Sequence, residues 1–227
     1  MDMIFVTQNT KGGVMDMIAK SPDNPTGVAY GELDEAYAYY NSRLFNDALP
    51  RCLMTLHNTG KRSAGYFSSK RFIRLADGTV CTDEIAMNPT LFQNRPLEEV
   101  LSTLAHEQCH LWQDHFGTPS RGKYHNKEWA AQMRSIGLMP SNTGKPGGRQ
   151  TGQQMSHYTL PDGPFARVTA ELLATGFVLS WGQRPLPEKP RLERPVKYTC
   201  LACGLIAKAK PDVRLTCTVC ADEMLAV

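Results

Sequence analysis

The sequence of 227 residues has no long hydrophobic run. A membrane-spanning helix needs about 18 consecutive apolar residues, and the most apolar stretch, residues 172–181, is much shorter. The first ten residues lack the basic start and the sustained apolar run of a secretory signal. We therefore expect a soluble cytoplasmic protein with no membrane partner.

An excess of charge of one sign is also missing. The chain has 25 Lys and Arg residues and 22 Asp and Glu residues, which gives a net charge of +3. The whole excess lies in residues 183–227, but four thiolates around a zinc ion would offset much of it. Charge alone therefore does not decide whether this tail binds DNA or serves only as a folding or docking module.

The cysteines do not suggest a disulfide framework, because there are seven of them and they are unevenly spaced. Three stand alone and are expected to be packing or surface residues: Cys52, Cys81 and Cys109. The others form two CxxC pairs separated by thirteen residues: Cys200, Cys203, Cys217 and Cys220. Two such pairs can close a tetrahedral zinc site with four thiolate ligands. We therefore predict a structural zinc ribbon over residues 197–227, which depends on the ion for its folding.

Composition divides the rest of the chain. Residues 1–30 contain Pro and Gly without a sustained period and are predicted to be a loose N-terminal leader. Residues 31–140 can form one hydrophobic core. Residues 141–182 combine a polar loop with an apolar packing segment, and residues 183–196 contain four prolines, as expected of a stiff linker.

The hydrophobic pattern predicts an α+β fold for the larger part. Apolar residues at three- and four-residue steps predict helices over residues 33–45, 97–116 and 126–136. Short runs rich in aromatic and branched residues between residues 52 and 87, separated by turn signals such as Asp77-Gly78, predict a small and largely antiparallel sheet. Residues 165–181 are apolar enough to pack on the core as a further helix or strand.

The central predicted helix contains the sequence His106-Glu107-Gln108-Cys109-His110. Residues i and i+4 lie on one face of a helix, so both imidazoles can bind one ion. Glu107 is rotated away from that face, so it can act as a general base on water instead of binding the metal. This is the geometry of a zinc peptidase, but HExxH also occurs by chance in helical proteins, and a third ligand is needed.

Residues downstream of the motif are candidates for that ligand. The metzincin spacing is excluded, because Gln113 and Phe116 occupy the positions that would have to be Gly and His. His115 lies on the same helix but is turned away from the other two histidines. His125 and Glu128 follow a loop that can fold back, and either residue can supply the ligand, with His125 favoured.

Several motifs in order over residues 31–140 resemble the SprT-like metalloprotease family, which includes Spartan. They are Leu44-Phe45, Leu49-Pro50, Gly65-Tyr66-Phe67, Ile85-Ala86-Met87-Asn88-Pro89, Thr103 to His110, and His125 followed by Trp129, Met133 and Ile136-Gly137-Leu138. In that family the third histidine often precedes a Gly, whereas here His125 precedes Asn126.

The resemblance implies a zincin-like minimal metalloprotease domain, in which a small sheet packs on the HExxH helix. It implies that His106, His110 and His125 hold zinc and that Glu107 is the general base. Zinc ribbons accompany many family members. By resemblance to Spartan-type members, the substrates are expected to be proteins bound or crosslinked to DNA, which implies a role in DNA repair.

A basic segment within the domain adds a second candidate surface. Five cations lie in fourteen residues that contain no acid but include Tyr66, Phe67 and Phe72. This mixture can bind phosphates and stacked bases, but it also suits a strand pair with buried aromatics, or an edge strand that takes a peptide. The candidate contacts to nucleic acid or substrate are Lys61, Arg62, Tyr66, Lys70 and Arg71.

We therefore predict a zinc-dependent endopeptidase with one catalytic zinc, one structural zinc and a protein substrate. The alternative is a zinc-containing adaptor or regulator that binds DNA or protein without proteolysis. Glu107 favours the first, because a purely structural site needs no carboxylate beside its ligands. Tyr124, Tyr158 and His157 are candidates for stabilising the oxyanion, although His157, like His57, is more typical of a surface or internally satisfied histidine.

Overall fold

The computed structural model describes residues 24–58, 63–184 and 194–227. The chain divides into two compact units, Met1–Arg184 and Pro185–Val227, which are described separately below. No helix among the described residues is both long and apolar enough to cross a lipid bilayer.

The first described helix, α2 (Pro25–Phe45), begins earlier than predicted. The Asn24 side chain accepts a hydrogen bond from the Gly27 N–H at 3.0 Å, and Pro25 occupies the first turn, where a missing N–H costs nothing. The prediction of a loose leader up to residue 30 is therefore wrong from residue 25 on, and residues 1–23 lie outside the described residues. The proline at position 25, which suggested a break, instead starts the helix.

A three-stranded sheet follows, with strands β1 (Leu53–Leu56), β2 (Gly65–Ile73) and β3 (Cys81–Met87) in the order β1-β3-β2. The prediction of a largely antiparallel sheet is wrong for one pair, because β1 runs parallel to β3. The chain reverses after β1 and again after β2, so β3 returns in the direction of β1 and enters between the two. Strand β2 is left at the edge of this sheet.

Strand β2 is irregular near its middle. The register with β3 shifts between Ser68 and Phe72, and Lys70 takes a left-handed conformation with φ of 48°. This is a β-bulge, which bends the strand without ending it. The predicted turn at Asp77-Gly78 is confirmed, since Gly78 has φ of 65° at the end of the β2–β3 hairpin.

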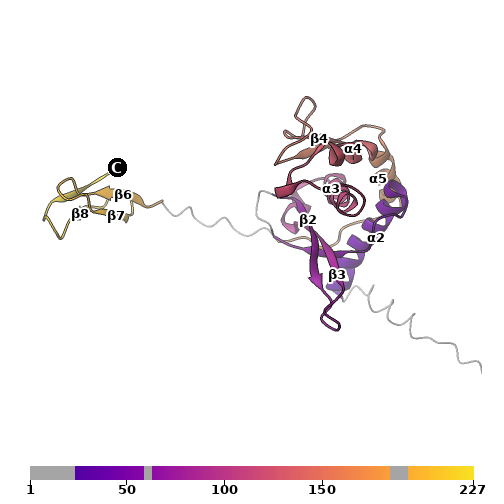
Figure 1. Cartoon of the computed structure of the whole chain (residues 1–227), viewed down its shortest axis with the longest axis horizontal. Coiled ribbons are helices and arrows are strands. Elements are labelled where there is room, and N and C mark those ends of the chain that lie inside the picture. Colours follow the sequence, from indigo (N-terminus) through magenta and orange to yellow (C-terminus); the bar gives the residue numbers. More distant parts are fainter. Residues whose placement is uncertain (1–23, 59–62, 185–193) are drawn as a thin grey trace, which may run out of the picture. The chain divides into compact units, whose positions relative to one another are not determined.

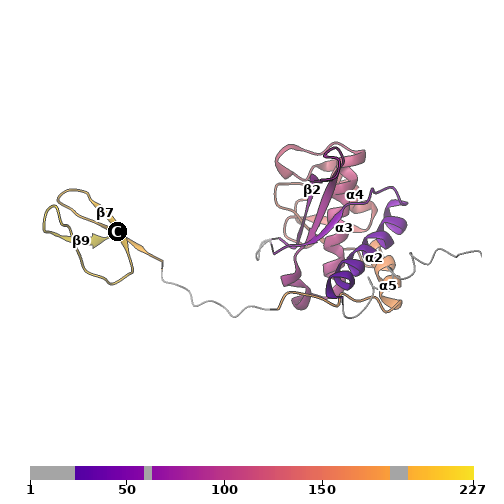
Figure 2. The ribbon, with the colours of Figure 1, turned by 90° about the horizontal axis from the view of Figure 1, so that it is seen from below.

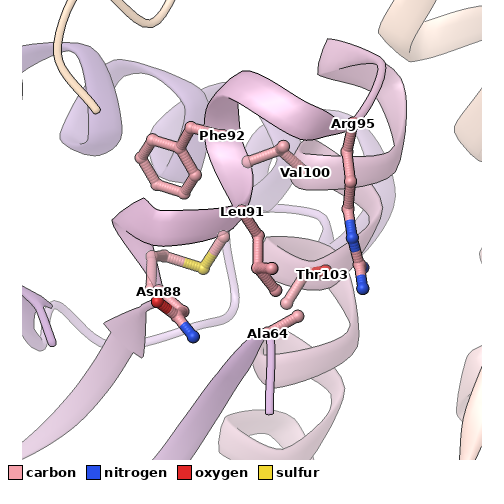
Figure 3. A pocket seen from close by; sticks show the side chains of 8 residues that line it. Ala64, Asn88, Leu91, Phe92, Arg95, Val100 and Thr103 are labelled. Carbon is pink, nitrogen blue, oxygen red and sulfur yellow. The ribbon is translucent and has the colours of Figure 1, made fainter. Parts of the chain in front are cut away.

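Helix α3 (Leu97–Phe116) runs through the centre of the first unit, as predicted (Figures 1 and 2). It contacts the sheet through β2 and β3 and also contacts α2 and the later helices. Its N-cap is Pro96, while Asn94 ends the preceding short helix η2 (Pro89–Asn94). Figure 3 shows a small pocket where Leu91 and Phe92 of η2 meet Val100 of α3.

The remainder of the first unit closes over the other side of α3. After the short turn η3 (Arg121–Lys123) come helix α4 (Lys127–Ser135), the hairpin of β4 (Leu138–Ser141) and β5 (Ser156–Thr159), and helix α5 (Pro164–Ala174). The predicted helix over residues 126–136 is confirmed. The segment 165–181 is a helix only as far as Ala174.

The second unit is a small four-stranded sheet. Its strands are β6 (Val196–Thr199), β7 (Ile206–Ala209), β8 (Leu215–Thr216) and β9 (Glu223–Ala226), in the order β7-β6-β9-β8. Its buried core consists of Tyr198, Met224 and two of the cysteines, Cys200 and Cys217. Of the predicted linker, residues 185–193 lie outside the described residues, and Val196 already belongs to β6.

Candidate metal centres and the cleft around them

Three histidines meet at the surface of α3. One turn of this helix separates His106 from His110, and their ring centroids lie 5.2 Å apart. His125, from the segment before α4, brings its ring to 4.7 Å from His110 and 5.7 Å from His106. One ring nitrogen of each residue lies within 4.8 Å of the other two. The structure thus groups the three histidines that the resemblance implies.

Trp129 forms the wall behind these rings. Its side chain is fully buried, and its ring centroid lies 4.9 Å from His106, 5.3 Å from His110 and 4.4 Å from His125. Helix α4 fixes its place, because the Trp129 N–H donates to the Asn126 side chain, the N-cap, at 3.0 Å. Asn126, which stands where the family often has Gly, therefore starts the helix that carries this wall.

His125 is held by the loop that follows β4. Its backbone N–H donates to the Gly152 carbonyl at 2.9 Å, and the Gly152 N–H donates back at 3.1 Å. The Nδ1 atom of His125 also lies 3.1 Å from the Gly152 carbonyl oxygen. Since a carbonyl can only accept, Nδ1 carries the proton and Nε2 keeps its lone pair. No sequence pattern indicates the part played by Gly152, because it lies in a long polar loop.

The three rings are suited to binding a metal at neutral pH. Burial lowers the pKa of His106 well below its usual range and that of His110 to about 3. Burial also lowers the pKa of His125, against the hydrogen bond to Gly152. Each imidazole is therefore neutral and offers a lone pair, which is the state that binds zinc.

Glu107 lies in the wall of the same site, against strand β2. It is buried, and burial raises its pKa to about 8, opposed by the Phe67 backbone and by the charge of Lys123. The approach of the strand depends on Gly65, since a Cβ there would lie 2.8 Å from the Ala86 carbonyl oxygen and 3.4 Å from Cγ of Glu107. The Gly65-Tyr66-Phe67 motif thus has a physical reason: only a residue without a side chain fits at its first position.

A cleft of about 1670 Å³ opens beside the histidines and Glu107. Its walls come from the start of β2, from one side of α3 and from the loop and strand over residues 153–159. Tyr124 and Tyr158 both line it, so both remain candidates for stabilising an oxyanion. His157 also lines it, but its ring nitrogens already contact His106 at 3.1 Å and Ser102 at 2.8 Å.

The two other candidates for the third ligand lie elsewhere. The Glu128 carboxylate accepts hydrogen bonds from the Thr118 N–H at 2.6 Å and from the Gln113 side chain at 2.7 Å. It therefore closes the loop between α3 and α4. The Nε2 atom of His115 lies 2.7 Å from the Asp83 carboxylate, in a separate group that includes Asp114.

The basic segment is only partly associated with the cleft. Lys61 and Arg62 lie outside the described residues, and Tyr66 lines the cleft. Among the described residues that line it, neither Lys70 nor Arg71 is found. Arg71 lies on an exposed part of β2, with its Nε 3.8 Å from the Glu84 carboxylate.

The second unit holds the other candidate metal centre. The Sγ atoms of the two CxxC pairs, Cys200 with Cys203 and Cys217 with Cys220, all lie within 4.8 Å of one another. Backbone N–H groups of Cys220 and Val219 lower the pKa of Cys217 to about 7, which favours the thiolate. All seven cysteines of the chain are free thiols, and Cys109 is buried while Cys81 is exposed.

Comparison with known proteins places the first unit in a family. The model of the SprT-like family matches residues 33–149, which include the HExxH motif and His125. The chain belongs to the SprT-like family. This membership supports a zincin-like fold and a metalloprotease-like function for the chain.

One curated relative of this SprT-like protein is described as an uncharacterized protein in the mucB 3′ region of Salmonella typhimurium. The two are 46% identical over 61 residues, which make up 27% of this chain and 80% of the relative. No solved structure gives a significant match.

The two ligand sets of the SprT-like chain fit zinc in different ways. Three neutral imidazoles that face an open cleft match a zinc site with one position left for water or substrate. Four clustered thiols match a closed structural site. Both groups are therefore compatible with zinc.

Proposed function

We propose that the SprT-like unit is a zinc-dependent endopeptidase. The observation that carries the proposal is the position of Glu107, buried beside three convergent histidines in the wall of an open cleft. A structural metal site needs neither a carboxylate next to its ligands nor access for a substrate.

The residues have distinct roles in this proposal. His106, His110 and His125 hold the ion, which when bound acidifies water and polarises the scissile carbonyl. Glu107 accepts a proton from the attacking water and then delivers it to the leaving amine. Burial raises the pKa of Glu107, and the charge of a bound ion would lower it, which would favour the carboxylate that accepts the proton.

The edge of the sheet favours a polypeptide substrate. Strand β2 is at the edge, and its residues Gly65 to Ser69 line the cleft. An extended peptide can therefore pair with this strand and pass the histidines. We further propose that the substrate is a protein bound or crosslinked to DNA. This step rests on the family resemblance and on the exposed cations Lys70 and Arg71 near the bend of β2.

The test compares the zinc-loaded full-length chain with Glu107→Gln on a DNA-binding protein, with and without single-stranded DNA. Glu98→Gln is the matched control, because Glu98 is exposed on the same helix and does not line the cleft. We expect Glu107→Gln to cleave about 10²–10⁴ times more slowly with unchanged zinc content, and Glu98→Gln to cleave like the wild type.

The same assay tests the alternative adaptor function. If the wild type and Glu107→Gln behave alike while both bind zinc and DNA, the peptidase proposal is wrong and the adaptor replaces it. A chain ending at Arg184 shows whether DNA stimulation depends on the cysteine unit. Stimulation that survives this truncation would assign the DNA contact to the first unit.

A further inference from the structure

The outward-facing nitrogens of two metal-site histidines are both occupied by residues beyond the family match. The Nδ1 atom of His125 faces the Gly152 carbonyl, and the Nδ1 atom of His106 lies 3.1 Å from Nδ1 of His157. Both partners follow residue 149, where the match to the SprT-like family ends. His157 is carried by β5, where its pairing with Pro140 of β4 sets its position along the hairpin.

A contact between two ring nitrogens contains one proton, so one ring donates and the other accepts. Which ring donates follows from the contact that the other nitrogen of His157, Nε2, makes with Ser102. The Ser102 hydroxyl donates its only hydrogen to the Glu99 carbonyl at 2.8 Å. Its oxygen can therefore only accept from Nε2 of His157, which lies 2.8 Å away.

The same reasoning places the proton of each ring. A neutral imidazole carries one proton, and in His157 this proton lies on Nε2, which faces Ser102, so Nδ1 has a free lone pair. That lone pair accepts from Nδ1–H of His106. The Nε2 atom of His106 is thereby left without a proton, so its lone pair can bind an ion held by the three histidines.

We propose that His157 is a positioning residue that fixes the tautomer and ring orientation of His106 for metal binding. The proposal rests on the zinc site described above and extends it by a chain of hydrogen bonds from His106 through His157 and Ser102 to the Glu99 carbonyl. Partners of this kind raise the affinity of a histidine for its metal. Residues 33–149 of this chain, which the family model matches, thus do not include these two partners.

The first test compares two substitutions that differ in hydrogen-bonding capacity. His157→Asn keeps an acceptor near the position of Nδ1, whereas His157→Leu removes it. The probe is zinc, titrated against a competing chelator into the full-length chain labelled with ¹⁵N in histidine, so that ring signals report on this site and not on the cysteine cluster. We expect His157→Leu to bind zinc about 10–100 times more weakly, and His157→Asn to stay close to the wild type.

The tautomer is measured directly in the same samples. Long-range ¹H–¹⁵N spectra of the zinc-free wild type should show His106 protonated at Nδ1 and His157 protonated at Nε2. Ser102→Ala should weaken this preference in His157. His115→Asn is the control, because His115 is on the same helix outside the metal group, and it should leave the zinc affinity unchanged.

The outcomes separate this inference from the proposed function. If a folded His157→Leu binds zinc like the wild type, or if His106 of the wild type is protonated at Nε2, the inference is wrong while the peptidase proposal stands. If the wild-type histidines do not bind zinc at all, both are wrong. Thermal unfolding of the zinc-free variants shows which are folded; should His157→Leu fail to fold, the tautomers of the wild type and of Ser102→Ala decide.

Discussion

The histidine cluster and the cysteine cluster bring their ligand atoms equally close, within 4.8 Å, but they are built differently. The histidines come from α3 and from the segment before α4, and the buried Trp129 packs behind them. The cysteines come from two short turns, each directly following a strand of two to four residues. In the first site, packed helices position the ligands. In the second site, the ligands are positioned only by short turns and strands.

This difference separates two uses of a metal ion. The first unit has an extended hydrophobic core, which includes Leu33, Tyr40, Leu104 and Phe165, so it can fold before it binds an ion. The core of the second unit contains Tyr198 and Met224 besides cysteines, which is too little for a stable domain. A bound ion would therefore supply chemistry in the first unit and folding free energy in the second.

Removal of zinc should show this contrast with the largest effect. Structural zinc sites of this kind contribute about 10–16 kcal/mol of apparent binding free energy. With a strong chelator, backbone NMR signals of residues 196–226 should collapse to unfolded positions, while those of α2, α3 and α4 stay dispersed. A common loss of signals from both units would show that the first unit also needs the ion to fold, and the comparison would fail.

Loss of the wall behind the histidines should have the next largest effect. Trp129→Ala removes a fully buried ring that contacts all three histidines, so we expect about 3–5 kcal/mol of lost unfolding free energy. Zinc binding by the histidines should weaken as well. Trp129→Phe keeps an aromatic ring at this place and should lose less of both. Urea unfolding of the zinc-free chain gives the stability, and a Trp129→Ala chain as stable as the wild type would refute the dependence of this site on its core.

The sequence predicts the ligands of the two centres better than it predicts the residues that orient them. The HExxH helix and the CxxC pairs are local patterns, so spacing alone predicts which side chains can meet. Gly152 and His157 depend on the pairing of β4 with β5 across a polar loop, which no local pattern reveals. The sequence indicates His157 only as a candidate for stabilising the oxyanion, and it does not indicate a contact with His106.

Two other features of the structure could not be predicted from local sequence patterns, again because they depend on contacts between distant residues. The parallel direction of β1 depends on the order in which the strands enter the sheet, and their alternation of residues does not contain that information. The sequence leaves His125 and Glu128 as alternatives because both lie near the start of α4. In the structure His125 groups with His106 and His110, whereas the Glu128 carboxylate accepts hydrogen bonds from Gln113 and Thr118.

Crowding at Glu107 should have a smaller effect on stability. In Gly65→Ala the new methyl group would lie 2.8 Å from the Ala86 carbonyl oxygen, a backbone atom, so strand β2 must shift. We expect a loss of about 1–3 kcal/mol, together with slower proteolysis because the strand supports Glu107. Gly31→Ala is the control, since a Cβ there meets nothing within 4 Å and lies in helix α2, where it should stabilise the chain slightly. Equal effects of the two substitutions would contradict the close approach at Gly65.

The smallest expected effect lies within the cysteine unit, where the two CxxC turns differ in the residue that follows the second cysteine. The fourth residue after the first cysteine of each pair is left-handed: Gly204 has φ of 74° and Ala221 has φ of 60°. In both turns this residue's N–H donates to the carbonyl of that first cysteine, Cys200 or Cys217, at 2.8 Å.

A side chain in this left-handed conformation costs about 1–2 kcal/mol. A Cβ at Gly204 meets nothing within 4 Å, so a substitution there would strain only the backbone. Since folding and zinc binding are coupled here, Gly204→Ala should weaken zinc binding by the cysteines about 5–30-fold. Ala221→Gly should strengthen it by less, because glycine also loses more entropy on folding. Chelator competition monitored by the ribbon NMR signals measures both, and changes of the same sign would show that the two turns are not equivalent.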